Sequence, residues 1–139
     1  MVQTFERKLM TTSFTVSTIL PASAECIYKA WLSSKMHAAF TGSAARIDPT
    51  VGGTFSVWDG YITGKNTQLE PYSRIIQSWR TTEFPAQAPD SRLEIVLKAV
   101  PEGTRITLKH SRIPEDQAEE YKRGWKEFYF SPMQAYFQT

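Results

Sequence analysis

The sequence contains a single cysteine, Cys26, and no long hydrophobic run among its 139 residues. One cysteine cannot form a disulfide within the chain, and this is typical of proteins in a reducing compartment. No stretch approaches the ~20 apolar residues that a membrane-spanning helix needs. The segment from Met1 to Phe14 has none of the apolar character of a signal peptide. We therefore expect a cytoplasmic protein that has no membrane partner.

Charge of one sign is also scarce, because 16 basic and 14 acidic side chains leave a formal net charge of +2. Basic and acidic residues alternate along the chain, so no segment could track a nucleic-acid backbone. Histidine is rare too: neither His37 nor His110 has a cysteine, histidine or aspartate at metal-ligand spacing. The sequence therefore predicts no nucleic-acid partner, no metal and no cofactor.

Recognisable catalytic signatures are missing as well. Gly52-Gly53 precedes a strand-like segment and has none of the context of a phosphate-binding loop. Four acidic residues near position 115 precede three basic ones at the spacing of exposed ion pairs on a helix; they are Glu115, Asp116, Glu119 and Glu120, followed by Lys122, Arg123 and Lys126. We expect these carboxylates to be solvated helix pairs, and we expect no catalytic centre.

Two residues have both a chemical and a structural interpretation. Cys26 falls near the start of the first expected helix, where the helix dipole could make its thiol reactive. A buried small hydrophobic residue is the favoured interpretation, because free cysteine is among the most buried residue types. For His110, on the inward side of a strand-like segment, a hydrogen-bonded structural role is favoured over a ligand or a base.

The chain does contain many short segments with alternating apolar residues, which indicate half-buried strands. After a polar arm at residues 1–12, we expect strands over 14–20, 45–48, 54–58, 61–69, 73–81, 92–100 and 104–111. Two short helices are expected after the first strand, one capped by Ser23 and one over 35–40 that ends at Gly42. Asp59-Gly60 is typical of a two-residue hairpin turn, and Pro101-Glu102-Gly103 of a second hairpin turn. The segment 83–90 is expected to be a loop.

The last element is the clearest, because an apolar stripe at helical spacing follows Pro114. The stripe consists of Ala118, Tyr121, Trp125, Phe128, Tyr129, Met133 and Tyr136. About 22 residues of helix span ~33 Å, which is enough to cross a sheet. Pro132 should kink this helix near Phe128. Gly124 is costly inside a helix, and a close-packing contact with the sheet is its favoured explanation.

Taken together, the pattern predicts an α+β domain in which an antiparallel sheet of about six to seven strands curves around the long C-terminal helix. Such an arrangement often leaves an apolar pocket between the two layers. Aromatic residues make up 13% of the sequence. They are read first as core, with the wall of a ligand cavity or a partner-facing patch as the open alternative.

Several segments resemble one family closely. They are Ile27–Trp31, Ala39–Thr41, Val51–Gly60, Leu69–Pro71, Ile75–Arg80 and Gly124–Phe130, and the resemblance extends over about residues 14–137. The family is the Aha-type C-terminal domain of the activator of the ninety-kilodalton heat-shock-protein ATPase. This resemblance implies the helix-grip fold of the START-like, birch-pollen-allergen-like (SRPBCC) superfamily, whose cavity often takes hydrophobic ligands. The eukaryotic co-chaperone also has a separate N-terminal domain, whereas we expect this chain to be a stand-alone domain over 13–139.

Three functions follow as hypotheses. The first is non-catalytic binding of a small hydrophobic or aromatic ligand in the cavity between sheet and helix. The second is a stress-related co-chaperone that contacts the ninety-kilodalton heat-shock protein and modulates its ATPase. The third is a polyketide cyclase-like enzyme, for which His110, Tyr129 and Lys65 are weak candidates. We expect a monomer or a weak homodimer in each case.

For the first hypothesis, the expected cavity residues are the inward-facing residues of the sheet and helices. They are Trp31, Phe40, Phe55, Val57, Trp79, Leu93, Ile95, Leu97, Leu108, His110, Tyr121, Trp125, Phe128, Tyr129 and Met133.

Overall fold

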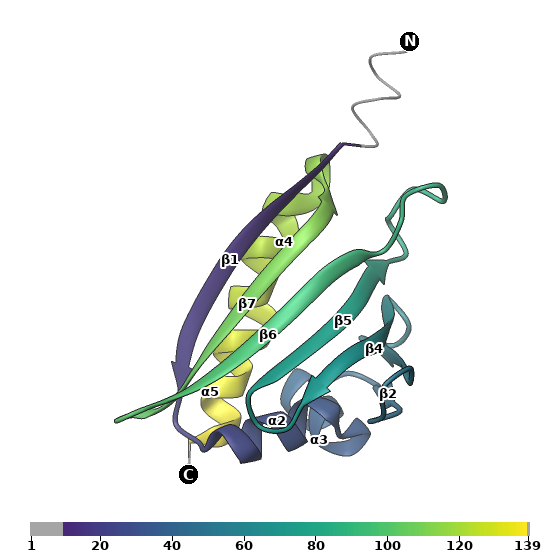
Figure 1. Ribbon diagram of the computed structural model, residues 1–139. Coiled ribbons are helices and arrows are strands. Elements are labelled where there is room, and N and C mark those ends of the chain that lie inside the picture. Colours follow the sequence, from purple (N-terminus) through teal and green to yellow (C-terminus); the bar gives the residue numbers. More distant parts are fainter. Residues whose placement is uncertain (1–9, 139) are drawn as a thin grey trace.

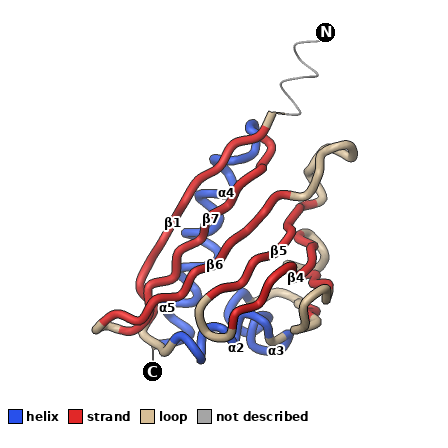
Figure 2. The backbone as a smooth tube through the Cα atoms, viewed as in Figure 1, coloured by secondary structure: helices blue, strands red, loops and turns tan. Residues whose placement is uncertain are grey.

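The structure is a computed structural model, and it describes residues 10–138 of the chain. A seven-stranded antiparallel sheet is covered on one face by a long C-terminal helix (Figures 1 and 2). The strands are β1 (Thr11–Leu20), β2 (Arg46–Ile47), β3 (Thr54–Val57), β4 (Ile62–Glu70), β5 (Arg74–Thr81), β6 (Ser91–Val100) and β7 (Gly103–Pro114). Their order across the sheet is β1-β7-β6-β5-β4-β3-β2. The predicted α+β class and the antiparallel sheet are confirmed.

The first strand begins earlier than predicted. Thr11 and Thr12, assigned to the flexible arm, pair with Ile113 and Pro114 of β7. The rest of the predicted arm, apart from Met10, lies outside the described residues. The cause is the length of β7, which runs three residues beyond the predicted Ser111 and offers β1 a longer partner.

Alternating residues of the central strands form the core. Ile106, Leu108 and His110 of β7 are fully buried on the face that the helix covers, as their spacing predicted. On β6, Leu93 and Ile95 are equally buried, whereas Ala99 is exposed although the same alternation placed it inside. Ala99 lies next to the β6–β7 turn, which extends past the helix (Figure 1), so no layer covers it there.

The turn after β3 is longer than the sequence predicted. Val57 pairs with Ile62, so four residues, Trp58 to Tyr61, connect the two strands instead of Asp59-Gly60 alone. Trp58, Asp59 and Gly60 have φ angles of 55°, 56° and 88°, all in the left-handed region. Trp58 is therefore the first residue of the turn and not the last residue of the strand.

Two short helices, α2 (Ala24–Leu32) and α3 (Ser34–Thr41), connect β1 to β2. The Ser23 hydroxyl caps α2 by accepting the Cys26 backbone N–H at 3.1 Å, and Gly42 ends α3 at a φ of 77°. Both caps agree with the sequence. Cys26 is only half-buried, contrary to the favoured interpretation, because it lies in the first turn of α2 and packs against the edge of the core.

The C-terminal helix is continuous but not uniform. A single 3₁₀ turn, η1 (Glu115–Gln117), leads into α4 (Ala118–Gly124), a π-helical turn η2 (Trp125–Phe130) and α5 (Ser131–Phe137). The N–H of Ser131 bonds to the carbonyl of Lys126, five residues earlier. Pro132 has no N–H to donate, and the wider turn directly before it accommodates that loss. The predicted effect of Pro132 therefore takes the form of a π turn.

The π turn also changes which residues face the sheet. Phe128 is 56% exposed and Tyr136 is half-buried, although both were placed on the buried stripe. Phe130 and Phe137 are buried instead. A π turn takes up more residues than an α turn. A residue three positions after Trp125 therefore lies further round from the buried face than α-helical spacing predicts.

Candidate functional site

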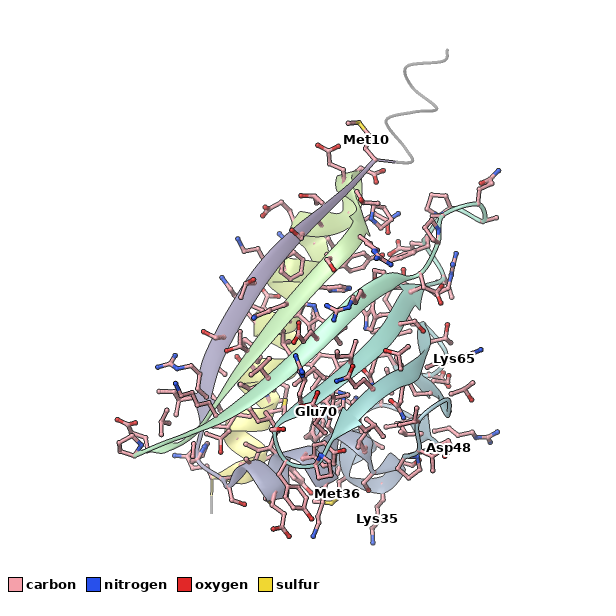
Figure 3. All side chains as sticks on the ribbon, viewed as in Figure 1. Met10, Lys35, Met36, Asp48, Lys65 and Glu70 are labelled. Carbon is pink, nitrogen blue, oxygen red and sulfur yellow. The ribbon has the colours of Figure 1, made fainter. Side chains whose placement is uncertain are left out.

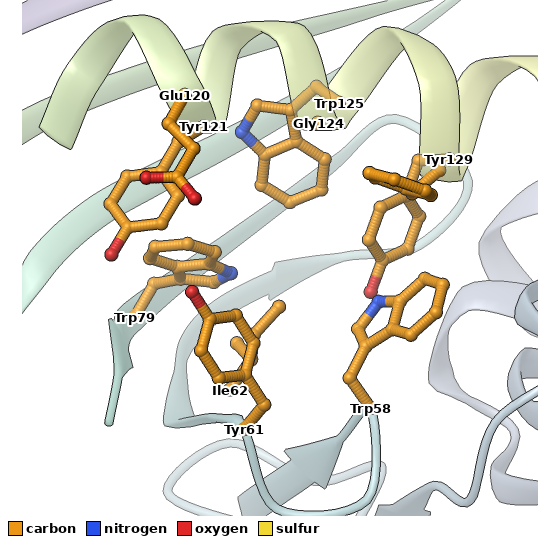
Figure 4. Close-up of a pocket in the computed structure, with 10 residues that line it drawn as sticks. Trp58, Tyr61, Ile62, Trp79, Glu120, Tyr121, Gly124, Trp125 and Tyr129 are labelled. Atoms are coloured by element: carbon orange, nitrogen blue, oxygen red, sulfur yellow. The ribbon is translucent and has the colours of Figure 1, made fainter. Parts of the chain in front are cut away.

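A pocket of about 390 Å³ lies between the C-terminal helix and the β3–β4 end of the sheet. We call it the aromatic pocket, because seven of its ten lining residues are aromatic (Figure 4). The helix contributes Glu120, Tyr121, Gly124, Trp125, Phe128 and Tyr129, and the opposite wall consists of Trp58, Tyr61, Ile62 and Trp79. Pockets that bind small molecules usually have ~300–1,000 Å³ and a mostly apolar lining.

Three aromatic residues, spaced four apart in the helix, form the helical side of the pocket. Tyr121, Trp125 and Tyr129 lie on successive turns and are buried. Gly124 opens the wall between them, because a Cβ at this position would meet only the Phe128 ring, at 3.8 Å. The predicted close-packing contact of Gly124 is therefore wrong, and the missing side chain leaves space in the pocket.

The opposite side depends on the left-handed turn at Trp58. A positive φ is costly for a bulky residue and is sustained only where surrounding contacts hold it. Here the indole of Trp58 packs edge-on against the rings of Phe128 and Tyr129, with 6.0 Å between ring centroids in each pair. Figure 4 shows the Trp58 indole nitrogen beside the Tyr129 hydroxyl.

One end of the pocket is polar. The Tyr121 hydroxyl donates to Gln117 Oε1 at 2.5 Å and accepts from Thr81 Oγ1 at 2.7 Å. The Tyr61 hydroxyl donates to the Glu83 carboxylate. Burial raises the pKa of Tyr61 and of Tyr121 above the ordinary phenol value, so both hydroxyls stay protonated at neutral pH.

Behind the pocket wall, His110 lies in a chain of hydrogen bonds that runs from Trp125 to the backbone carbonyl of Trp79. The Trp125 Nε1–H donates to His110 Nδ1 at 3.1 Å, so the ring proton is on Nε2 and points to Ser91 Oγ at 2.9 Å. Ser91 Oγ in turn donates to the Trp79 carbonyl at 2.6 Å. Burial lowers the pKa of His110 to about 3, so the ring is neutral. These contacts agree with the predicted structural role of His110.

His37 forms the corresponding contact for Tyr129. Its Nδ1 lies 2.9 Å from the Trp31 carbonyl, which can only accept, so Nδ1 carries the proton. Nε2 then accepts from the Tyr129 hydroxyl at 3.0 Å. Burial lowers the pKa of His37 to about 4 and raises the pKa of Tyr129. Two successive turns of the helix are thus each fixed by a neutral, buried histidine.

The predicted cavity residues divide between pocket and core. Those that line the aromatic pocket are Trp79, Tyr121, Trp125, Phe128 and Tyr129. Trp31, Phe55 and Val57 line a separate void of about 10 Å³, which could hold one water molecule. The others are packed in the core: Phe40, Leu93, Ile95, Leu97, Leu108, His110 and Met133.

Five lining residues were not among the expected cavity residues: Trp58, Tyr61, Ile62, Glu120 and Gly124, although Trp58 belonged to the aromatic residues whose alternative role was a cavity wall. The sequence carried a signal for three of them. Gly124 in the middle of a helix called for an explanation, and the turn signal at Asp59-Gly60 marked where Trp58 and Tyr61 leave the sheet. Glu120 gave no signal, because acidic residues at helix starts are common.

Of the remaining polar candidates, Glu120 lines the pocket and the others do not. Lys65 is exposed on β4 and does not line the pocket (Figure 3). The acidic residues of the helix are exposed as predicted, but residues 10–138 contain no salt bridge between them and the basic residues that follow. Within the same range, no group of three or more His, Cys, Asp or Glu side chains could hold a metal ion.

Comparison with known proteins gives a consistent result. Residues 21–138 match the model of the family described as "Activator of Hsp90 ATPase homolog 1-like protein". The chain is 25% identical over 130 residues to the Activator of 90 kDa heat shock protein ATPase homolog 1 of Homo sapiens, a match that covers 94% of this chain and 38% of the human protein. It is 33% identical over 89 residues to a Dictyostelium discoideum homolog, covering 63% of this chain and 23% of that protein. The chain thus spans less than half the length of these relatives.

Solved structures share the fold. An HSP90 activator from Plasmodium falciparum superposes with a TM-score of 0.82 at 23% identity, covering 89% of this chain and 94% of that one. DynU16, a protein in the dynemicin biosynthetic locus, superposes with a TM-score of 0.76 at 20% identity, covering 92% of this chain and 48% of that one.

No helix within residues 10–138 combines the length and the apolarity needed to cross a bilayer.

The family match covers nearly every described element, from Pro21 through α5. The chain therefore belongs to the Activator of Hsp90 ATPase homolog 1-like protein family and has the helix-grip fold that the sequence resemblance implied.

Proposed function

We propose that this chain binds a small apolar or aromatic molecule in the aromatic pocket and does not transform it. The observation that carries the proposal is the pocket itself: about 390 Å³ of space walled by aromatic rings, in a domain whose remaining core is closely filled. A core between a helix and a sheet is more stable when side chains fill such a space. A helical glycine at its centre, where alanine would be tolerated, supports a pocket that is kept open.

The pocket provides its own reporter of binding. Trp58, Trp79 and Trp125 line it, and they are three of the four tryptophans in the chain. A ligand in the pocket should therefore change the intrinsic fluorescence strongly. It should also raise the stability by ~2.7 kcal/mol at a concentration 100 times its Kd.

The test is a fluorescence and thermal-shift titration with fatty acids, flavonoids, sterols and polycyclic aromatics, on the wild type and on Gly124→Leu. Leucine at this position fills the open wall and is a better helix former than glycine. We expect the variant to be as stable as the wild type and to have lost ligand binding.

The matched control is Arg123→Leu, which adds the same side chain at an exposed position outside the pocket and should bind like the wild type. Binding that survives Gly124→Leu unchanged, or no binding by any class of ligand, would contradict the proposal. A cytoplasmic location belongs to the same proposal, and the single cysteine supports it.

A second candidate function is contact with a 90 kDa heat shock protein. It is favoured by the relatives, since those from Homo sapiens and Dictyostelium discoideum are both named as activators of that ATPase. The test is a steady-state ATPase assay of the purified chaperone with increasing amounts of this chain. Unchanged turnover and no binding at tens of micromolar would exclude this role. An increase that persists in Gly124→Leu would show that it does not use the pocket.

A further inference from the structure

We propose that the aromatic pocket prefers planar aromatic ligands that carry a positive charge, and that Glu120 is the residue that selects them. This inference rests on the proposed function, and it adds the charge of the ligand. Three features of the wall support it: its rings, its one carboxylate and the hydrogen bonds at its polar end.

The rings favour a flat cation. The indoles of Trp79 and Trp125 lie 5.8 Å apart, and Trp125 is 4.7 Å from the ring of Tyr129, measured between centroids. These rings form a continuous aromatic wall against which a planar ligand can pack. The faces of Trp and Tyr carry negative potential and attract cations, Trp most strongly.

Glu120 is the only charged residue among the ten that line the pocket. Figure 4 shows its carboxylate pointing from the helix toward the strands of the opposite wall. It has no salt bridge to any residue in the range 10–138, although Lys122 and Arg123 follow it on the same helix. The carboxylate is therefore available to a ligand.

The two tyrosine hydroxyls at the polar end of the pocket can still accept hydrogen bonds, but their own protons are already donated. The Tyr61 hydroxyl donates its only proton to Glu83, so its remaining capacity is that of an acceptor. The Tyr121 hydroxyl donates to Gln117 and accepts from Thr81. An ammonium or iminium group would find acceptors here, whereas these two hydroxyls offer no free proton to a carboxylate on a ligand.

The charge of the whole chain does not explain such a preference. The formal net charge is +2, which at long range attracts anions. A preference for cations would therefore have to come from the pocket, and this makes the inference testable by one substitution.

The experiment measures Kd by fluorescence for three ligands that share a three-ring skeleton: 9-aminoacridine, a cation at pH 8; acridine, neutral; and 9-anthracenecarboxylate, an anion. We expect the affinity order cation, neutral, anion. Glu120→Gln should weaken 9-aminoacridine by about two- to fivefold, the range for an exposed charge next to aromatic rings. It should leave acridine within about twofold and strengthen the anion.

The matched control is Glu119→Gln, which removes the same charge from the neighbouring position outside the pocket and should leave all three affinities close to wild type. Equal affinities for the three ligands, all lost in Gly124→Leu, would overturn the charge preference and keep the proposed function. A cation preference that survives Glu120→Gln, or that Glu119→Gln reduces equally, would overturn the role of Glu120. Failure of all three ligands to bind would overturn both proposals.

Discussion

At the scale of single residues, two glycines within regular elements have opposite roles. Gly64 lies inside β4, where a Cβ would be 1.8 Å from the Ser78 carbonyl oxygen and 2.7 Å from the Phe55 ring. Gly124 lies inside the helix, where a Cβ would have only an ordinary contact with Phe128. The first glycine permits close approach of two strands, and the second leaves space in the aromatic pocket.

The same substitution should therefore have opposite effects at the two positions. Gly64→Ala should lower the free energy of unfolding by about 1–3 kcal/mol, because neither backbone nor ring can move away easily. Gly124→Ala should raise it by up to ~1 kcal/mol, the difference in helix propensity. Urea unfolding of both variants checks this. A destabilised Gly124→Ala would show that the wall of the pocket is closed at that position.

At the scale of elements, the π turn in the C-terminal helix changes which residues of the apolar stripe are buried. The apolar stripe identified the helix and most of its buried face, including Tyr121, Trp125, Tyr129 and Met133. It did not predict that Phe128 lies at the rim of the pocket, because the π turn alters the rotation per residue.

Two truncations on this helix measure which face is buried. Trp125→Ala should lower the free energy of unfolding by about 3–5 kcal/mol, since it opens the core and removes the donor to His110. Phe128→Ala should cost less than about 1 kcal/mol, because the side chain is 56% exposed. Thermal or urea unfolding gives both values. A cost below ~1 kcal/mol for Trp125→Ala would mean that this face does not pack on the sheet.

At the scale of the whole molecule, the two buried histidines couple stability to pH. In the folded chain the pKa of His37 is about 4 and that of His110 about 3, both below the ordinary 6.5. Below pH 6.5 the unfolded chain takes up protons at these residues while the folded chain does not. Their contribution to stability is therefore complete above pH 6.5 and is lost progressively as the pH falls toward 4 and 3.

Between pH 7 and pH 5.5 we expect the free energy of unfolding to fall by roughly 1 kcal/mol for each histidine. This interval lies above the range in which most carboxylates titrate, so the histidines dominate it. Urea unfolding at the two pH values measures the loss, and His110→Gln should halve it, whatever its stability at pH 7. An equal loss in the variant would assign the pH dependence to other groups.

Much of this arrangement was accessible from the sequence. The order of the strands, the caps at Ser23 and Gly42, the loop at 83–90 and the long final helix follow from rules that act over a few residues: alternation, side-chain capping and helical spacing. The family resemblance then indicated a sheet wrapped around that helix.

The composition of the aromatic pocket was decided by tertiary structure. Whether an aromatic residue fills the core, as Trp31 does, or borders a space, as Trp58 does, depends on what lies opposite it in three dimensions. The left-handed turn at Trp58 is held by contacts with Phe128 and Tyr129 of the helix, more than 50 residues later in the chain. Local sequence fixes elements because the forces that form them are local, whereas a cavity is the space that remains after distant elements have packed.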